Sequence, residues 1–155
     1  MVTIGAVYTA DAIVESVSNL IRELIPQCRL INFVDSGLIP DIIRDNGVTT
    51  GTARRLLNLI NGAENANVDV IFNTCSSVGE VADAARTFVS TPIVKIDQPM
   101  AAKAVTLASK IGVMATLPST LAPTVRLVQS EAPKAGESVE IVEGLAEGAF
   151  AALTS

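Results

Sequence analysis

The segment Asn73-Thr74-Cys75-Ser76-Ser77 combines a thiol, an amide and three hydroxyl groups, and it directly follows the largely apolar run 68–72. Such a run predicts a buried strand, and the small polar residues after it predict a loop at the end of that strand. A thiolate is a nucleophile and a base, and the start of a helix favours its formation. Cys75 is therefore the candidate catalytic residue of the chain.

Composition excludes several classes of function. The chain contains no histidine, which rules out a Ser-His or Cys-His catalytic pair and imidazole ligands for a metal, so we expect no metal site. A net charge of −5 argues against nucleic-acid binding. No apolar stretch reaches the roughly 18 residues of a membrane span, and the amino terminus lacks the features of a secretory signal. We expect a soluble, cytoplasmic protein that binds no membrane and keeps both cysteines as thiols.

Strand and helix patterns alternate along the first part of the chain. Alternation of this kind produces right-handed crossovers and a parallel sheet. The sequence predicts an α/β fold whose first domain, residues 1–96, is a parallel four-stranded sheet flanked by helices. A loop is expected through Pro40 and Asn46-Gly47, and Thr49 is expected to cap the helix that follows. The predicted strands are 2–7, 29–34, 68–72 and 92–96, and the predicted helices are 10–24, 50–63 and 78–88.

Polar residues fall at the carboxyl ends of several predicted strands. In open parallel sheets ligands bind at this edge, where Thr9, Asp35 and Cys75 all lie. Thr9 is a candidate substrate contact, although a threonine after a strand is also a common helix cap. Asp35 is expected to stabilise its local turn. Cys28 precedes the second strand, at the opposite edge, and is expected to be structural.

Residues 4–9 are repeated at 111–116 with a constant offset of 107 and three identities in six positions. Residues 34–38 also resemble 142–145 with one residue deleted, and two matches in the same order indicate duplication. Residues 97–155 are thus expected to begin a second, pseudosymmetric α/β domain that is incomplete. The offset places the counterpart of Cys75 near position 182, beyond Ser155, so the chain is either truncated or naturally short. The unfinished domain and the apolar excess favour a homo-oligomer.

The second domain supplies further polar candidates. Thr116 occupies the position equivalent to Thr9 in the repeat. Ser119 and Thr120 are expected either to contact a substrate or to cap a helix beginning near Leu121. Two charged residues at the domain boundary, Lys95 and Asp97, are expected to be hinge or surface charges.

The motif 73–77, together with Ala115-Thr116-Leu117-Pro118-Ser119-Thr120, resembles the aspartate/glutamate racemase superfamily. This superfamily also contains hydantoin and allantoin racemases, arylmalonate decarboxylase and maleate isomerase. The resemblance implies two pseudosymmetric α/β domains with the active site between them. It further implies a cofactor-independent racemase or epimerase that acts on an amino acid or a close derivative. One cysteine removes the α-proton as thiolate and a second delivers a proton as thiol; Cys75 matches the first, and nothing here matches the second.

A racemase without a cofactor must stabilise a carbanion and hold a small carboxylate-bearing substrate. Hydroxyl groups and backbone N–H groups near a helix start suit this task. Asn73 is expected to bind a substrate amino or carboxylate group, or to close a turn through its side chain. The other candidate substrate contacts are Thr74, Ser76 and Ser77 in the first domain and Thr116, Ser119 and Thr120 in the second.

Three alternatives remain open on the sequence. A maleate-type cis-trans isomerase would use a nucleophilic thiol at the position of Cys75. A decarboxylase is disfavoured, because the arylmalonate decarboxylases keep only the cysteine of the second half. The chain is otherwise a non-catalytic fragment or ligand-binding module, which predicts no cysteine near position 182.

Overall fold

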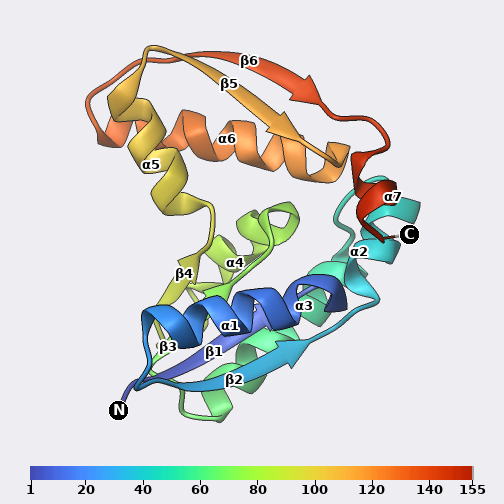
Figure 1. Cartoon of the computed structure of the whole chain (residues 1–155), viewed down its shortest axis with the longest axis vertical. Coiled ribbons are helices and arrows are strands. Elements are labelled where there is room, and N and C mark those ends of the chain that lie inside the picture. Colours follow the sequence, from blue (N-terminus) through green and yellow to red (C-terminus); the bar gives the residue numbers. More distant parts are fainter. Residues whose placement is uncertain (155) are drawn as a thin grey trace. The chain divides into compact units, whose positions relative to one another are not determined.

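The strand β1 lies inside a four-stranded parallel sheet whose strand order is β2-β1-β3-β4 (Figure 1). Every residue of β1 after Thr3 is buried, as expected for a parallel strand covered on both faces. The predicted four-stranded α/β sheet is confirmed. The computed structural model describes residues 1–154. The elements of the first part of the chain are β1 (Thr3–Tyr8), η1 (Asp11–Ile13), α1 (Val14–Leu24), β2 (Arg29–Val34), α2 (Leu38–Arg44), α3 (Thr50–Asn65), β3 (Val70–Asn73), η2 (Ser76–Val78), α4 (Gly79–Ala85) and β4 (Ile93–Lys95).

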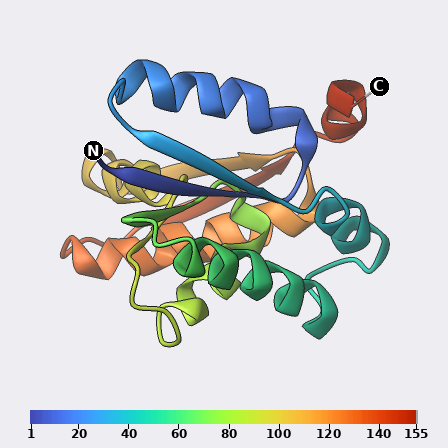
Figure 2. The same ribbon diagram turned by 90° about the horizontal axis from the view of Figure 1, so that it is seen from below.

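Helices cover the two faces of this sheet, with α1 on one face and α3 on the other (Figure 2). Ile4, Ala6 and Tyr8 of β1 form a buried cluster with Ile21 of α1. Gly5 faces α3, and a Cβ added there would lie 3.1 Å from side-chain atoms of Ala63 and Val68. The absence of a side chain at Gly5 therefore lets α3 pack closely on the central strand.

The cover provided by α1 is only partial. The sequence spacing suggests one apolar face that includes Leu20 and Leu24, yet these side chains are 52% and 70% exposed. Beside α1, an apolar groove of about 270 Å³ opens on the β3 and β4 side of the same sheet face. The groove contains no polar lining residue and is separate from the motif of residues 73–77. Its lining residues are Ile4, Ile21, Leu24, Ile25, Val70, Phe72 and Val94.

The helix α3 begins as the sequence predicts. The Thr49 hydroxyl accepts the backbone N–H of Thr52 at 3.2 Å, and the Thr52 hydroxyl accepts the backbone N–H of Thr49 at 2.8 Å. This reciprocal pair is a capping box, which satisfies two backbone donors at the helix start. The N-cap prediction for Thr49 is confirmed.

The loop predicted through Pro40 is wrong, because residues Leu38–Arg44 form the helix α2. Pro40 is the third helical residue, where a missing N–H breaks no intrahelical bond. The buried positions 38, 39 and 42 have helical spacing, which was the overlooked signal. The turn predicted at Asn46-Gly47 does follow the helix, and both residues have positive φ, 52° and 149°.

Asp35 stabilises its turn, as predicted. Its Oδ1 accepts the backbone N–H of Gly37 at 3.1 Å, and its carboxylate accepts two bonds from Arg55 of α3, one of them from Nε to Oδ2 at 2.7 Å. Arg55 Nη1 also donates to Asp41 Oδ2 at 2.5 Å. The hydrogen bonds from Arg55 are the main reason that the pKa of Asp35 lies below its ordinary value of 3.8.

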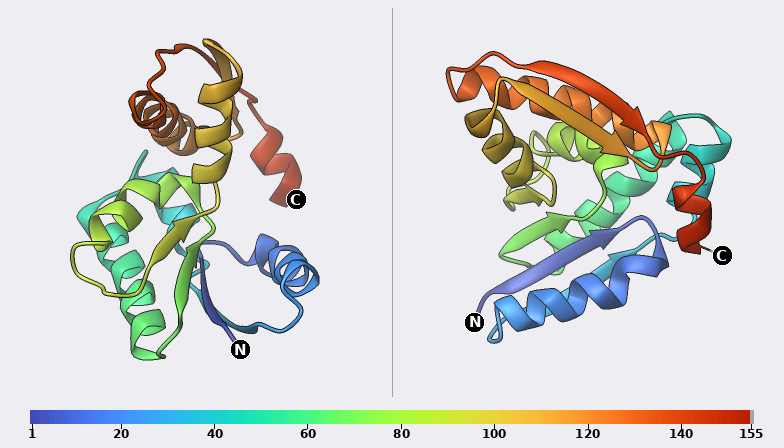
Figure 3. Two further views of the ribbon diagram at one scale, coloured as in Figure 1. Left: turned by 90° about the vertical axis from the view of Figure 1, so that its left-hand side faces the viewer. Right: turned by 45° about the horizontal axis from the view of Figure 1, so that its top comes forward.

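The chain divides into two units, Met1–Lys95 and Ile96–Ser155. In the second unit β5 and β6 run side by side in parallel, as the right-hand view of Figure 3 shows. The helices α5 and α6 contribute Val105, Val125 and Val128 to a core that also contains Val113 of β5. On the other face of this sheet Met114 is 78% exposed. The elements are α5 (Gln98–Leu107), β5 (Lys110–Ala115), α6 (Pro118–Lys134), β6 (Glu140–Leu145) and α7 (Ala149–Thr154).

The sequence repeat falls on equivalent elements of the two units. β1 begins at Thr3 and β5 at Lys110, which reproduces the offset of 107 residues. Each strand is followed by a helical segment and then by a parallel partner strand. The first residues of the partners are paired in both cases, Thr3 with Arg29 and Lys110 with Glu140. No helix within residues 1–154 is both long enough and apolar enough to cross a membrane.

Asp35→Asn is expected to destabilise the first unit at neutral pH and to change its pH dependence. A carboxyl group whose pKa is lower in the folded chain contributes stability above its unfolded pKa and loses it as pH falls through the folded value. The difference in unfolding free energy between wild type and Asp35→Asn should therefore shrink as pH drops below about 3.8. Tyr8 is the single tyrosine, the chain has no tryptophan, and Tyr8 is fully buried, so urea unfolding followed by tyrosine fluorescence reports this unit.

Ser36→Ala, in the same turn, serves as the matched control, because no charge is removed. An Asp35→Asn effect of constant size from pH 7 to pH 2.5 would contradict the assigned role of the Arg55 bonds.

Candidate functional site

The candidate site lies at the carboxyl edge of the first sheet, between β1 and β3. β1 pairs with β2 on one side and with β3 on the other, so the chain reverses its direction of winding at this point. In open α/β sheets such a switch point opens a crevice in which ligands bind. Thr9 follows β1 at this edge, and the segment 74–77 follows β3. The structure therefore brings the candidate residues of the first unit to one edge.

Thr74 fastens the Cys75 segment to β1. Its backbone N–H and its hydroxyl both donate to the carbonyl oxygen of Val7, at 3.2 and 2.8 Å. Thr74 is buried, and its single hydroxyl proton is used in this bond. Its position in the structure is that of an anchor that fixes the loop two residues away from Thr9, which is also buried.

Cys75 is a free, half-buried cysteine in extended conformation (φ −126°, ψ 119°) immediately before η2. It occupies the N-cap position of η2, and its side chain makes no capping hydrogen bond there. The thiol is thus not consumed by closing the helix start. Ser76 is half-buried next to it and Ser77 is buried, so the hydroxyl-bearing residues predicted around the thiol adjoin it in the chain.

Asn73 is fully buried at the end of β3 and has one satisfied and one unsatisfied side-chain group. Its Nδ2 donates to the carbonyl oxygen of Cys75 at 2.9 Å. Because this nitrogen faces a carbonyl, the orientation of the amide is fixed and Oδ1 is the remaining acceptor. Within residues 1–154 no hydrogen-bond donor reaches Oδ1. A buried acceptor without a donor is costly, and a ligand donor would relieve that cost.

Lys95 is not the surface or hinge charge that the sequence suggested. It is only 3% exposed, and its Nζ donates to Asp83 Oδ2 of α4 at 2.5 Å. The prediction failed because Lys95 alternates with exposed Val94 and shares the buried side of β4 with Ile93. That period-two pattern was the signal for an inward-facing lysine. Asp97 is buried as well, and its Oδ1 has no partner in the described part of the chain.

In the second unit the alternative of a helix cap at Ser119 or Thr120 is wrong. α6 begins at Pro118, three residues before the predicted start, and Leu117 is its N-cap. Ser119 and Thr120 therefore lie inside the first turn. The Ser119 hydroxyl oxygen is buried and has no partner among residues 1–154, whereas Thr116, directly after β5, is exposed.

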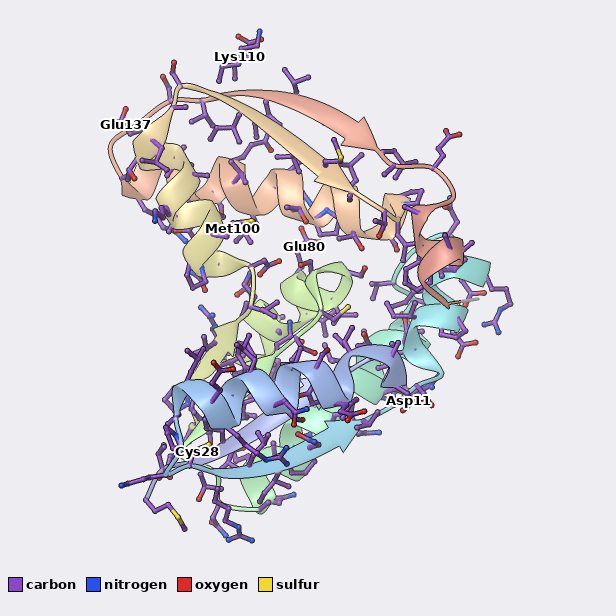
Figure 4. The ribbon with its side chains drawn as sticks, in the orientation of Figure 1. Asp11, Cys28, Glu80, Met100, Lys110 and Glu137 are labelled. Carbon is purple, nitrogen blue, oxygen red and sulfur yellow. The ribbon has the colours of Figure 1, made fainter. Side chains whose placement is uncertain are left out.

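Cys28 lies far from this edge. It immediately precedes β2 and packs, half-buried, against the cluster beneath α1. Figure 4 labels Cys28 and Asp11 at opposite ends of α1. The predicted structural position of Cys28 is confirmed. No three His, Cys, Asp or Glu side chains of the described residues gather in a way that could hold a metal ion.

Comparison with solved structures gives the same fold. The glutamate racemase from Aquifex pyrophilus matches with a TM-score of 0.70 and 20% identity, over 91% of this chain and 54% of that chain. The glutamate racemase from Francisella tularensis subsp. tularensis SCHU S4, solved in complex with D-glutamate, matches with a TM-score of 0.66 and 15% identity, over 93% of this chain and 52% of that one. The chain thus spans about half the length of these structures.

Sequence comparison identifies the family. No curated protein matches the chain at a significant level. The family model for Asp/Glu/Hydantoin racemase matches residues 5–150, which includes the Cys75 motif, both repeats and nearly all described elements. The chain therefore belongs to the Asp/Glu/Hydantoin racemase family.

Proposed function

We propose that this chain carries the Cys75 half of the active site of a cofactor-independent racemase or epimerase of an amino acid or a close derivative. The observation that carries the proposal is the position of Cys75: a free, half-buried thiol at the switch point of the sheet, held there by the bonds from Thr74 to Val7. Family membership supports the reaction class. The cytoplasmic setting and self-association stay predictions.

In the proposed reaction the thiolate of Cys75 removes the α-proton of the substrate. The electron pair of the broken C–H bond delocalises into the adjacent carboxyl group, and the proton moves to sulfur. A second acid on the opposite side of the α-carbon then returns a proton, which inverts the centre. No residue of this chain is assigned that second role, and the Ser76 and Ser77 hydroxyls and the second-unit residues Thr116, Ser119 and Thr120 remain proposed substrate contacts.

Asn73 favours an amino acid over the alternative substrates. Its unpaired Oδ1 accepts a hydrogen bond, and an α-ammonium group or the N–H of a hydantoin supplies one. Maleate and arylmalonates carry no comparable donor. The isomerase and decarboxylase alternatives would leave this buried acceptor unsatisfied, which supports the racemase reading.

The first test is exchange of the α-proton in D₂O, followed by NMR with the enantiomers of aspartate and glutamate and with hydantoins. The thiolate half-site should exchange the α-proton of at least one of these substrates, and Cys75→Ser should lower the exchange rate at least 100-fold, because the base is removed. Exchange without inversion is expected if the second acid is missing.

Cys28→Ser is the matched control, since it removes the other thiol and should leave exchange unchanged. Absence of exchange with every substrate would sink the proposal for this chain and leave the reading as a ligand-binding module.

A second test addresses the role of Asn73. Binding of D-glutamate and of glutarate, which lacks only the amino group, is compared by NMR titration. D-Glutamate should bind about tenfold or more tightly, as expected for one hydrogen bond between a buried acceptor and a charged donor. Asn73→Leu should reduce that preference to less than about threefold. Equal affinities of the wild-type chain for the two ligands would contradict the assignment.

A further inference from the structure

Lys95 places a positive charge inside the first unit, next to the candidate site. It is the last residue of β4 and the register partner of Asn73 in β3. Paired residues of neighbouring parallel strands point to the same face, about 4.8 Å apart. The lysine and the asparagine therefore stand side by side at the carboxyl edge of the sheet.

The ammonium group lies close to the start of α4. An added Cβ at Gly79, the first residue of α4, would be 3.8 Å from Lys95 Nζ. Gly79 comes four residues after Cys75, and only η2 separates them. The charge thus sits beneath the segment that leads from the thiol into the helix, where water is largely excluded and a charge acts over several ångströms.

The positive charge is incompletely neutralised by its surroundings. The carboxylate of Asp83 accepts the Lys95 ammonium at 2.5 Å, but it also lies 3.6 Å from Nη2 of Arg86. Two cations thus share one carboxylate, and the group of three carries a net charge of +1. The Asp83 side chain is 43% exposed, so water further weakens its compensation of the buried lysine.

Burial of an ammonium group is costly, and an apolar side chain would fill the same space at lower cost, as Ile93 does two residues earlier on the same side of β4. We propose that Lys95 is a specificity-determining residue: its charge draws the carboxylate of the substrate to the Cys75 segment. The inference rests on the proposed function. With the acceptor of Asn73 beside it, the edge offers complementary groups to both charges of an α-amino acid.

Local charge at Cys75 is measurable without any substrate. Iodoacetate and iodoacetamide alkylate the same thiolate, but only iodoacetate is an anion, so the ratio of their rates reports the electrostatic potential and cancels the ionised fraction of the thiol. Both rates are measured on the 155-residue chain by mass spectrometry of the peptides that contain Cys75 and Cys28. Cys28, at the opposite edge, is the internal control.

Lys95→Met should lower the iodoacetate-to-iodoacetamide ratio at Cys75 about fivefold or more. Asp83→Asn should raise the ratio, because it removes the only carboxylate of the group, and Lys95→Arg should keep it within about twofold. The ratio at Cys28 should not change in any variant. Lys95→Met should also leave the urea midpoint of the Tyr8 signal unchanged or raise it, because the remaining Asp83 is half-exposed and has Arg86 as a partner.

A ratio at Cys75 that Lys95→Met leaves within twofold of wild type would overturn the inference. A fall in both alkylation rates by the same factor would also overturn it, since that result indicates a purely structural lysine. Neither outcome depends on proton exchange, so failure of the inference is distinguishable from failure of the proposed function.

Discussion

The buried strand β1 is the constraint from which the geometry of the candidate site follows. It pairs in parallel with β2 and β3, and its own side chains are covered on both faces. Because both neighbours are fixed in register, the carboxyl ends of β1 and β3 meet at one edge of the sheet. Thr74 adds two bonds to the carbonyl oxygen of Val7, so the segment carrying Cys75 takes its position directly from the central strand.

The strands and most helices of the first unit were predictable from sequence, because burial on both faces forces continuous apolar runs and Thr49 carries the chemistry of a helix cap. The errors have local causes. Pro40 and Pro118 suggest loops, yet each lies in the first turn of a helix, where proline is tolerated. The start of α6 and the whole of α2 were lost in this way. The duplication was visible because the two strands concerned kept half of their residues.

The candidate site was predictable only as a set of residue types. Cys75 stood out because a thiol among small polar residues after a buried strand is unusual. The use of the Thr74 hydroxyl, the fixed amide of Asn73 and the burial of Lys95 depend on residues of β1, η2 and α4 that are distant in sequence. Sequence spacing carries no information on such partners, and the expectation for Lys95 failed for that reason. The contribution of Thr116, Ser119 and Thr120 to the same site stays a prediction.

The two thiols occupy opposite edges of the sheet, and this separation governs how the protein responds to oxidants. Cys28 precedes the strand residue level with Thr3, whereas Cys75 comes two residues after the partner of Val7. At about 3.3 Å per residue the two edges are roughly 20 Å apart, while a disulfide requires Cα atoms within about 7 Å. Cys28 therefore cannot act as a resolving thiol within the same unit. A sulfenic acid formed at Cys75 must be rescued by an external thiol, or it proceeds to irreversible oxidation.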